Sequence, residues 1–189
     1  DTTVEKLYAA VVCRSLQEAG FRVCLHAFPA GEQSKNLGTF GGMLEFLAEN
    51  KLTRSDFVVA LGGGVTGDMA GFAAAVYQRG VDYIQMPTTF LAASDSSVGG
   101  KTAIDLAAGK NLAGAFHQPK MVICDTDTFR TLPPDAFAGG MAETLKHGLI
   151  ADGDFYRFLM TGDVRTHMDE VVRRNVEIKA AVVGEDERE

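Results

Sequence analysis

The chain has 189 residues, 46% of them hydrophobic, and a formal net charge of −7 at pH 7. This length fits one domain, or one domain and part of another, and the acidic balance excludes a general nucleic-acid-binding surface. The sequence has no apolar run of about 18 residues and no basic leader before an apolar segment, so we expect no membrane span and no export. Its three cysteines lack C-x-x-C spacing, which indicates reduced thiols in a cytoplasmic protein.

The first part of the chain alternates between helical and strand patterns. Apolar spacing predicts helices over 3–19 and 37–50, and strands over 21–28, 57–61, 83–86 and 121–124. The segment 94–114 is polar and glycine-rich, and we expect an irregular loop with a function. The alternation itself predicts an α/β fold with a parallel sheet covered by helices on both faces.

The pattern changes after Thr131-Leu132-Pro133-Pro134, which predicts a domain boundary. Beyond it the periodicity is helical only, over 135–150, 154–160 and 163–183. We therefore predict an α/β domain over 1–132 and the beginning of an all-α domain over 133–189. The chain starts at Asp1 without a methionine, and we expect both of its ends to be truncated.

A glycine turn follows the central predicted strand. Gly62, Gly63 and Gly64 stand between the apolar run 57–61 and an alanine-rich segment with helical character. With Gly67 they satisfy G-x-G-x-x-G in a strand–turn–helix context, where free N–H groups at a helix start can bind a phosphate. The turn alone fits an anion site and a plain tight connection equally well.

Charged residues in the glycine-rich segment form a second candidate. Asp95, Lys101, Lys110 and Asn111 suit an acidic, phosphorylated substrate, and the glycines beside both lysines favour that interpretation over a solvated loop. Thr88 and Thr89, at a strand end, are candidates for the same anion site as the glycine turn.

The third candidate lies on the predicted helix 135–150. Glu143 and Lys146 share a helical face. They could be a metal ligand and the partner of an anion, or an ordinary surface ion pair. Their spacing alone favours the surface pair. His147 follows Glu143 by four residues and is interpreted as a supporting or packing residue. Asp82 opens its strand, whereas a ribose-binding acid belongs at the strand's carboxyl end.

Four motifs in order resemble the 3-dehydroquinate synthase family of sugar phosphate cyclases. They are GGGVTGDMAGFAAAVYQRG, QMPTTFLAASDSSVGGKTAID, GKNLAGAFHQP and TLPPDAFAGGMAETLKHG. The resemblance covers about Ala30 to Glu189 and identifies the chain as a central fragment of such an enzyme. It implies a Rossmann-like NAD-binding domain followed by the start of an α-helical metal and substrate domain.

The resemblance implies specific roles. The NAD-binding residues would be Glu32, Lys35, Gly64, Val65, Thr66, Gly67, Asp68, Thr88, Thr89, Lys101, Lys110, Thr128, Phe129, Arg130 and Thr131. The substrate-site and catalytic residues would be Asp95, Lys101, Asn111, Lys146 and Lys179, with Arg79 reaching a neighbouring subunit's substrate in a homodimer. Glu143 would be one of three ligands of Zn²⁺ or Co²⁺.

The chain also departs from the family pattern. Ala30 stands where an aspartate is usual, and Arg130 where a lysine is common. The other two metal ligands of the family are histidines that fall beyond the end of this chain. We therefore expect the 189 residues alone to be inactive or nearly so.

The implied reaction converts 3-deoxy-D-arabino-heptulosonate 7-phosphate into 3-dehydroquinate and phosphate, in the shikimate pathway of aromatic amino acid biosynthesis. It proceeds by transient oxidation with NAD, phosphate elimination and intramolecular aldol closure. Three alternatives remain: another sugar phosphate cyclase such as 2-deoxy-scyllo-inosose synthase, an NAD- and metal-dependent polyol dehydrogenase, and a non-catalytic nucleotide-binding fragment. The expected partner is a phosphorylated sugar acid, with no nucleic acid and no membrane.

Overall fold

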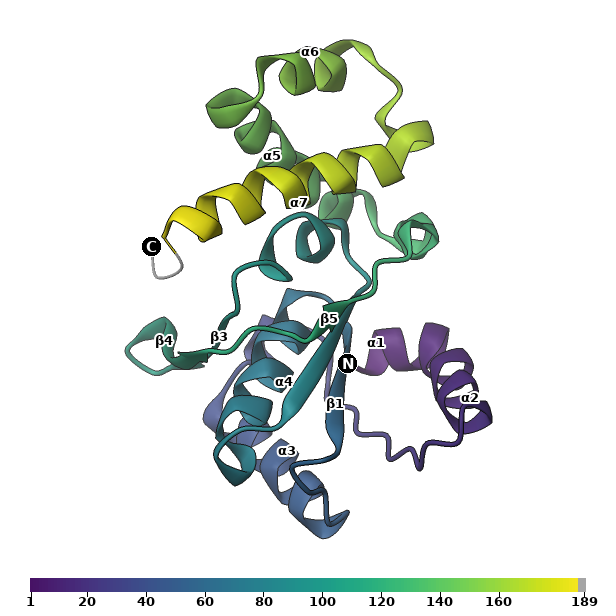
Figure 1. The fold of residues 1–189 in the computed structure, drawn as a ribbon, viewed down its shortest axis with the longest axis vertical. Helices are drawn as coiled ribbons and strands as arrows, with labels where there is room; N and C mark the ends of the chain where they lie inside the picture. The colour runs from purple at the N-terminus through teal and green to yellow at the C-terminus, as the bar shows by residue number, and fades with distance from the viewer. Residues whose placement is uncertain (187–189) are drawn as a thin grey trace.

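A three-stranded parallel sheet forms the centre of the first part of the chain (Figure 1). The structure is a computed structural model and describes residues 1–186. The strands β1 (Phe57–Gly62), β2 (Asp82–Pro87) and β5 (Met121–Val122) lie in the order β1-β2-β5. β1 and β2 pair in register from Phe57↔Asp82 to Gly62↔Pro87, so their carboxyl ends lie side by side. The predicted α/β class is confirmed.

Small residues let the helix α4 (Gly64–Val76) pack closely on this sheet. Ala70, Ala73 and Ala74 are almost fully buried, and a Cβ on Gly71 would lie 3.1 Å from the Tyr83 ring of β2. The helix α3 (Leu37–Glu49) packs beside α4 through the stacked rings of Phe40 and Phe72, whose centroids are 4.6 Å apart. These contacts fix the first turn of α4 against the carboxyl end of the sheet.

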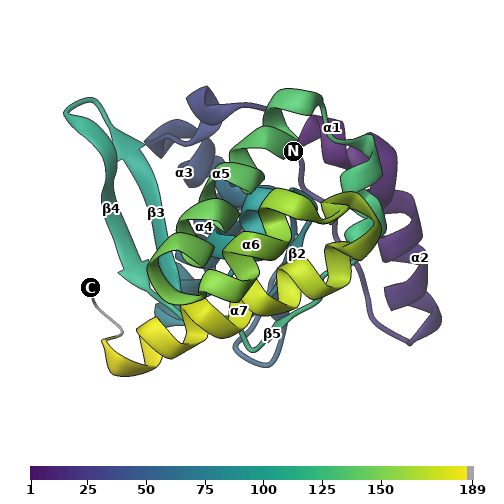
Figure 2. The ribbon, with the colours of Figure 1, turned by 90° about the horizontal axis from the view of Figure 1, so that it is seen from above.

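The predicted N-terminal helix is confirmed as three consecutive helical segments. These are α1 (Thr2–Val4), the π-helical η1 (Glu5–Ala9) and α2 (Ala10–Glu18). The first two views place them on one side of the sheet, opposite a β-hairpin formed by β3 (Lys101–Leu106) and β4 (Gly109–Phe116) (Figures 1 and 2).

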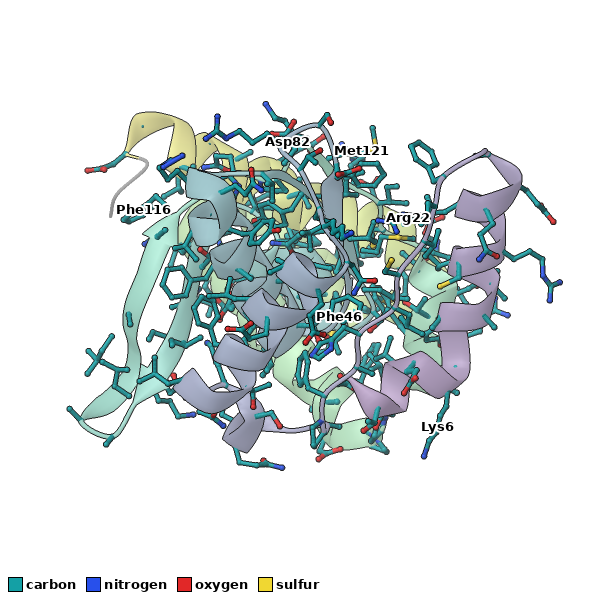
Figure 3. The ribbon with its side chains drawn as sticks, turned by 90° about the horizontal axis from the view of Figure 1, so that it is seen from below. Lys6, Arg22, Phe46, Asp82, Phe116 and Met121 are labelled. Carbon is teal, nitrogen blue, oxygen red and sulfur yellow. The ribbon has the colours of Figure 1, made fainter. Side chains whose placement is uncertain are left out.

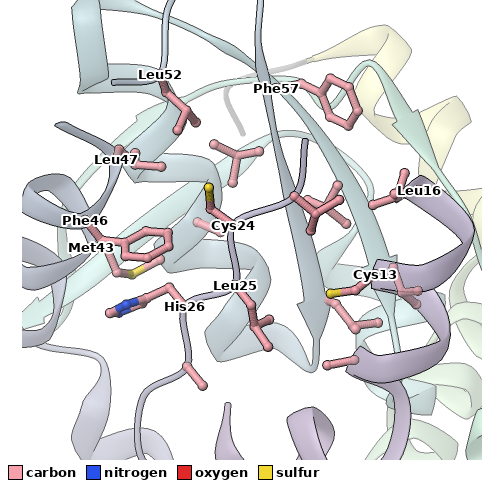
Figure 4. A pocket seen from close by; sticks show the side chains of 18 of the residues that line it. Cys13, Leu16, Cys24, Leu25, His26, Met43, Phe46, Leu47, Leu52 and Phe57 are labelled. Carbon is pink, nitrogen blue, oxygen red and sulfur yellow. The ribbon is translucent and has the colours of Figure 1, made fainter. Parts of the chain in front are cut away.

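The predicted strand over 21–28 is wrong. The segment forms neither a helix nor a strand, and within residues 1–186 no backbone hydrogen bond joins it to β1. Instead, the Phe28 carbonyl accepts a hydrogen bond from the Thr2 amide, and Arg22 donates to the Asn50 carbonyl. An apolar cavity of about 330 Å³ lies between the segment, α2, α3 and β1 (Figure 4). Alternating apolar residues alone do not make a strand when no neighbouring strand supplies hydrogen bonds.

The expectation of an irregular loop over 94–114 is also wrong for most of its length. A short π-helix, η4 (Ala92–Ser96), is followed by a turn and the antiparallel hairpin of β3 (Lys101–Leu106) and β4 (Gly109–Phe116). Gly99 and Gly100 have φ angles of 105° and 65°, which permit the sharp entry into β3. Thr102 and Ile104 are buried while Lys101 is exposed, an alternation that marks a half-buried strand.

The remainder is helical, as predicted. It comprises η5 (Thr126–Thr131), α5 (Pro134–Ala151), α6 (Gly153–Thr161), η6 (Val164–His167) and α7 (Met168–Glu185). A single hydrophobic cluster joins Phe90 and Phe129 to Phe137, Phe155 and Val171, so apolar packing continues across the predicted boundary. The division into domains at residues 132 and 133 stays a prediction.

No helix within residues 1–186 combines the length and the apolar character that crossing a bilayer requires.

Candidate functional site

The glycine turn is enclosed so tightly that side chains do not fit. β1 ends at Gly62, Gly63 precedes α4 without a side-chain cap, and α4 begins at Gly64. A Cβ on Gly62 would lie 2.4 Å from the Thr66 hydroxyl oxygen, and one on Gly63 would lie 3.0 Å from the Thr89 methyl carbon. Because no side chain caps the helix start, its first N–H groups are available to bind an anion.

Two buried hydroxyls beside this turn fit a polar ligand. Thr66 and Thr88 are 7% and 4% exposed, and within residues 1–186 neither Oγ1 atom has a hydrogen-bond partner. A buried polar group without a partner costs about 1–3 kcal/mol, which a bound phosphate group would relieve. The amide of Thr88 donates to the Gly62 carbonyl at 2.9 Å, which ties the end of β2 to the turn.

A buried lysine joins the N-terminal half of α4 to the hairpin. Lys35, just after η2 (Glu32–Ser34), donates from Nζ to Asp68 Oδ2 at 2.6 Å and to Asn111 Oδ1 at 2.5 Å. Burial raises the pKa of Asp68 above its ordinary value, and the Lys35 ammonium opposes that rise. Glu32 and Lys110 form an exposed ion pair at 3.1 Å nearby. Five predicted cofactor and substrate residues therefore come together here.

A second polar cluster brings together the other predicted substrate and metal residues. Lys179, on α7, donates from Nζ to the backbone oxygen of Asp95 at 2.6 Å and to its Oδ1 at 2.5 Å. Glu143 and Lys146, on α5, form an ion pair whose carboxylate faces the same place. Asp95 lies on η4, so three separate elements meet at this cluster. Its carboxylates are donors that suit a divalent cation.

His147, for which the sequence predicts a supporting or packing role, belongs to the same cluster. Its ring is 4% exposed, and its Nε2 lies 3.9 Å from Glu143 Oε1 and 4.0 Å from Asp95 Oδ1. Asn175, on α7, accepts from the other ring nitrogen, Nδ1, at 2.7 Å. The spacing of four residues from Glu143 indicated His147, but nothing in the sequence indicated Asn175.

The short helix η4 connects the glycine turn to the second cluster. A Cβ on Gly64 would lie 3.2 Å from the Ser96 hydroxyl, while the preceding residue, Asp95, binds Lys179. Ser94 is fully buried, and its hydroxyl has no hydrogen-bond partner within the described residues. An anion at the turn and a cation at the carboxylates would therefore lie on the two sides of one helical turn.

Other predicted residues lie apart from both clusters. Thr128–Thr131 occupy η5, where the Tyr8 hydroxyl donates to the Thr128 carbonyl at 3.2 Å and lies 2.6 Å from Thr131 Oγ1. Phe129 is buried against Phe90, and Arg130 forms an exposed ion pair with Asp127. Nothing in these contacts joins η5 to the glycine turn.

Arg79 is also remote. It ends η3 (Tyr77–Arg79), which follows the C-terminal end of α4, so it lies roughly 20 Å along that helix from Gly64. Gln78 and Arg79 both have positive φ angles, 49° and 66°, a strained conformation for residues with a Cβ. Hydrogen bonds from Gln78 Nε2 to the Leu52 carbonyl and from Arg54 to the Gln78 carbonyl hold this turn.

Two further placements bear on the sequence predictions. Asp82 lies at the opposite end of β2 from the glycine turn, where it faces Lys120 at 3.6 Å on the surface (Figure 3). This position agrees with its exclusion as a ribose-binding acid. The apolar cavity beside β1 touches the predicted site at Thr66 alone, and its labelled lining includes Cys13, Cys24 and Phe46 (Figure 4).

Two models of one protein family match residues 25–189 of the chain. A family model described as 3-dehydroquinate synthase N-terminal matches residues 25–139, and one described as 3-dehydroquinate synthase C-terminal matches residues 140–189. The 3-dehydroquinate synthase of Cereibacter sphaeroides is 50% identical over 194 residues, which cover 100% of this chain and 52% of the relative. The chain thus spans about half the length of the curated relatives it matches.

Solved structures of sugar phosphate cyclases share the fold. The 2-epi-5-epi-valiolone synthase ValA from Streptomyces hygroscopicus, with NAD⁺ and Zn²⁺ bound, is 26% identical with a TM-score of 0.86, covering 98% of this chain and 54% of that one. A 2-deoxy-scyllo-inosose synthase, complexed with carbaglucose-6-phosphate, NAD⁺ and Co²⁺, is 34% identical with a TM-score of 0.77, covering 85% and 46%.

Proposed function

The chain belongs to the 3-dehydroquinate synthase family, and we propose that the protein containing it converts 3-deoxy-D-arabino-heptulosonate 7-phosphate into 3-dehydroquinate and phosphate. The observation that carries the proposal is the meeting of Asp95, Glu143, Lys146 and Lys179 beside the glycine turn. Carboxylates for a cation and ammonium groups for two anionic substrate groups then lie next to an anion-binding helix start. Because the chain spans about half of its relatives, the activity is that of the longer protein, and the 189 residues alone are expected to be inactive or nearly so.

The cofactor part of the proposal rests on the turn and on the Lys35 network. The N–H groups at the start of α4 and the hydroxyls of Thr66 and Thr88 would bind the pyrophosphate of NAD. Hydrogen bonds from the Lys35 ammonium group hold the side chains of Asp68 and Asn111 in fixed positions. When bound, NAD supplies the transient oxidation of a substrate hydroxyl, and a divalent metal such as Zn²⁺ or Co²⁺ supplies the positive charge that polarises that hydroxyl.

The chain's own residues then orient the substrate. Lys146 and Lys179 would bind the phosphate and carboxylate groups, with Lys101 and Asn111 contributing from the hairpin. Lys179 is held between the side chain and the backbone of Asp95, so its ammonium group is already positioned by α7 and η4. Fixing the substrate in this way lowers the entropic part of the barrier to elimination and ring closure.

Arg79 is assigned to a homodimer. It lies far from the clusters of its own chain and is presented by a strained turn, which suits a side chain that completes the site of a second subunit. We also propose a cytoplasmic location, in the shikimate pathway, for the complete enzyme.

The decisive assay measures phosphate release by the full-length protein with the heptulosonate phosphate, NAD and Zn²⁺. Lys179→Met should lower kcat/KM by about 100-fold or more, because it removes a preorganised charge from the site. Lys120→Met is the matched control, since Lys120 pairs with Asp82 on the surface and should leave kcat/KM unchanged. No release from the heptulosonate phosphate by the wild-type protein would refute the proposal.

A second candidate is a 2-deoxy-scyllo-inosose synthase activity, favoured by the 34% identity to such an enzyme. The same assay with glucose 6-phosphate distinguishes the two. Phosphate release from glucose 6-phosphate, without release from the heptulosonate phosphate, would favour the second candidate.

A further inference from the structure

The hairpin of β3 and β4 contains a β-bulge at two of the predicted site residues. The register of the two strands shifts around Asp105, which alone on β3 faces the three residues 110–112 of β4. Lys110 and Asn111 therefore leave the regular β-ladder. A bulge re-aims the side chains that it carries, and bulges are common beside active sites. The bulge thus determines how Asn111 is presented to the rest of the molecule.

Asn111 has a backbone conformation that residues with a Cβ seldom adopt. Its φ angle is 57°, in the left-handed region, which asparagine tolerates better than most residues other than glycine. Such a conformation persists only where the surrounding contacts hold it. Two contacts, one to its backbone and one to its side chain, hold Asn111 in this conformation.

These contacts form a closed ring of hydrogen bonds among three residues. The Asn111 amide donates to Asp105 Oδ1 at 2.8 Å, and the Asp105 amide donates to the Lys35 carbonyl at 2.9 Å. Lys35 Nζ closes the ring by donating to Asn111 Oδ1 at 2.5 Å. Both amides displaced from the β-ladder thus have an acceptor, and the Asp105 carboxylate holds the Asn111 backbone directly.

The ring also fixes which end of the Asn111 side chain faces outward. Because an ammonium group only donates, Asn111 Oδ1 must face Lys35, and the Nδ2 group must face away from it. Asn111 is exposed, and within residues 1–186 its Nδ2 group has no hydrogen-bond partner. Lys35 is 5% exposed and is bound in turn by Asp68 of α4. Asn111 therefore presents two N–H donors from a position tied to the helix that begins at the glycine turn.

We propose that Asp105 is a positioning residue of the substrate site. Its carboxylate holds the left-handed backbone of Asn111, so that the Asn111 Nδ2 group donates to an oxygen atom of the substrate. The inference deepens the proposed function and rests on it, because the substrate role of Asn111 belongs to that function. Asp105 itself is outside the set of site residues predicted from the sequence. An asparagine at position 105 would offer the same acceptor oxygen to the Asn111 amide, whereas an alanine would offer none.

The test measures phosphate release by the full-length protein with the heptulosonate phosphate, NAD and Zn²⁺. Asp105→Ala should lower kcat/KM by about 10–100-fold, because Asn111 is no longer held in place. Asp105→Asn should stay within about 3-fold of the wild-type value, because it keeps the acceptor oxygen. Asp56→Ala is the matched control: it removes a carboxylate that accepts from the Thr53 amide at 2.7 Å, at the opposite end of β1 from the glycine turn, and should leave kcat/KM unchanged.

A double-mutant cycle shows whether Asp105 acts through Asn111. Asn111→Ala should itself lower kcat/KM, and adding Asp105→Ala to it should lower kcat/KM further by less than about 2-fold. A purely structural role of Asp105 would give the same factor in both backgrounds. Thermal unfolding reports whether each variant folds. NADH binding by Asp105→Ala should equal that of the wild-type protein, because the backbone amide that bonds to Lys35 remains.

The outcomes separate this inference from the proposed function. No phosphate release by the wild-type protein would refute the proposed function. With an active wild-type protein, an unchanged kcat/KM in Asp105→Ala would overturn the positioning role alone, and so would equal factors in the two backgrounds of the cycle. An Asp105→Asn variant as impaired as Asp105→Ala would overturn it in favour of a role for the charge. Loss of NADH binding together with activity would overturn it in favour of a folding role.

Discussion

Replacing Lys35 with methionine should strongly destabilise the protein, because it leaves Asp68 buried without its cation. The two side chains are 5% and 19% exposed, and the ammonium also donates to Asn111. Removing one member of a buried ion pair costs about 3–5 kcal/mol, and the partial exposure of Asp68 places the expected loss near the lower end, about 3 kcal/mol. For a chain of this size, that corresponds to a fall in Tm of roughly 6–12 °C.

The stability lost in Lys35→Met should become smaller as the pH falls. Burial raises the pKa of Asp68, and Lys35 opposes that rise, so the substitution raises the pKa further. A carboxyl with a raised folded pKa binds more protons in the folded state than in the unfolded state. Stability then rises as the pH falls through the folded pKa toward the ordinary carboxyl value of about 4. The deficit of Lys35→Met should therefore be largest near pH 8 and shrink on acidification.

The assay is guanidinium unfolding of the wild-type protein and Lys35→Met over this pH range, without NAD. Lys110→Met is the matched control, since its ion pair with Glu32 is exposed and contributes about 0–1 kcal/mol. Adding Asp68→Asn to Lys35→Met should recover part of the loss, because it removes the uncompensated charge. A deficit below about 1 kcal/mol, or one that does not change with pH, would refute the role given to this buried pair.

Three further predictions concern single positions. Gly62→Ala should lower the free energy of unfolding by about 2 kcal/mol and abolish NADH binding, measured by fluorescence, because its Cβ would lie 2.4 Å from the Thr66 hydroxyl. As a control, Gly41→Ala, with open space around it, should raise the free energy of unfolding by about 0.5–1 kcal/mol. Although Cys124 is exposed as a residue, desolvation of its thiol and nearby carboxylates raise its pKa to about 11, so alkylation should be slow at pH 8 and accelerate steeply toward pH 11. Asp152→Ala should lower the free energy of unfolding by about 1 kcal/mol, because it removes the N-cap of α6. Backbone hydrogen bonding lowers the pKa of Asp152, so the stabilisation by this carboxylate should vanish as the pH falls below the ordinary carboxyl range. Measuring Tm of the wild-type protein and the variant at decreasing pH would detect that loss.

Local chemistry along the chain determined the central element and the family. An apolar run, three glycines and an alanine-rich helix fix a strand–turn–helix unit, because their steric and burial preferences act between near neighbours. The helices after Pro134 followed from apolar periodicity for the same reason. The motifs around Asp95, Asn111 and Glu143 identified the family without any knowledge of where these side chains lie.

Secondary-structure prediction from the sequence was wrong where a strand depends on a partner far away in the chain. The segment 21–28 has the alternation of a strand, but no strand within residues 1–186 pairs with it, whereas the residues after Gly100 pair with β4 and form a hairpin. Strand formation requires hydrogen bonds to another part of the chain, and periodicity does not report whether that part is in place.

Only the tertiary structure decided which residues meet. Packing of α7 against η4 brings Lys179 to Asp95, 84 positions earlier in the chain, and Asn175 to His147. The surface-pair interpretation of Glu143 and Lys146 came from spacing on one helix, which carries no information about carboxylates and rings on other elements. The amide that meets the His147 ring is itself held by the Val171 carbonyl, a relation that exists only once the helices have packed.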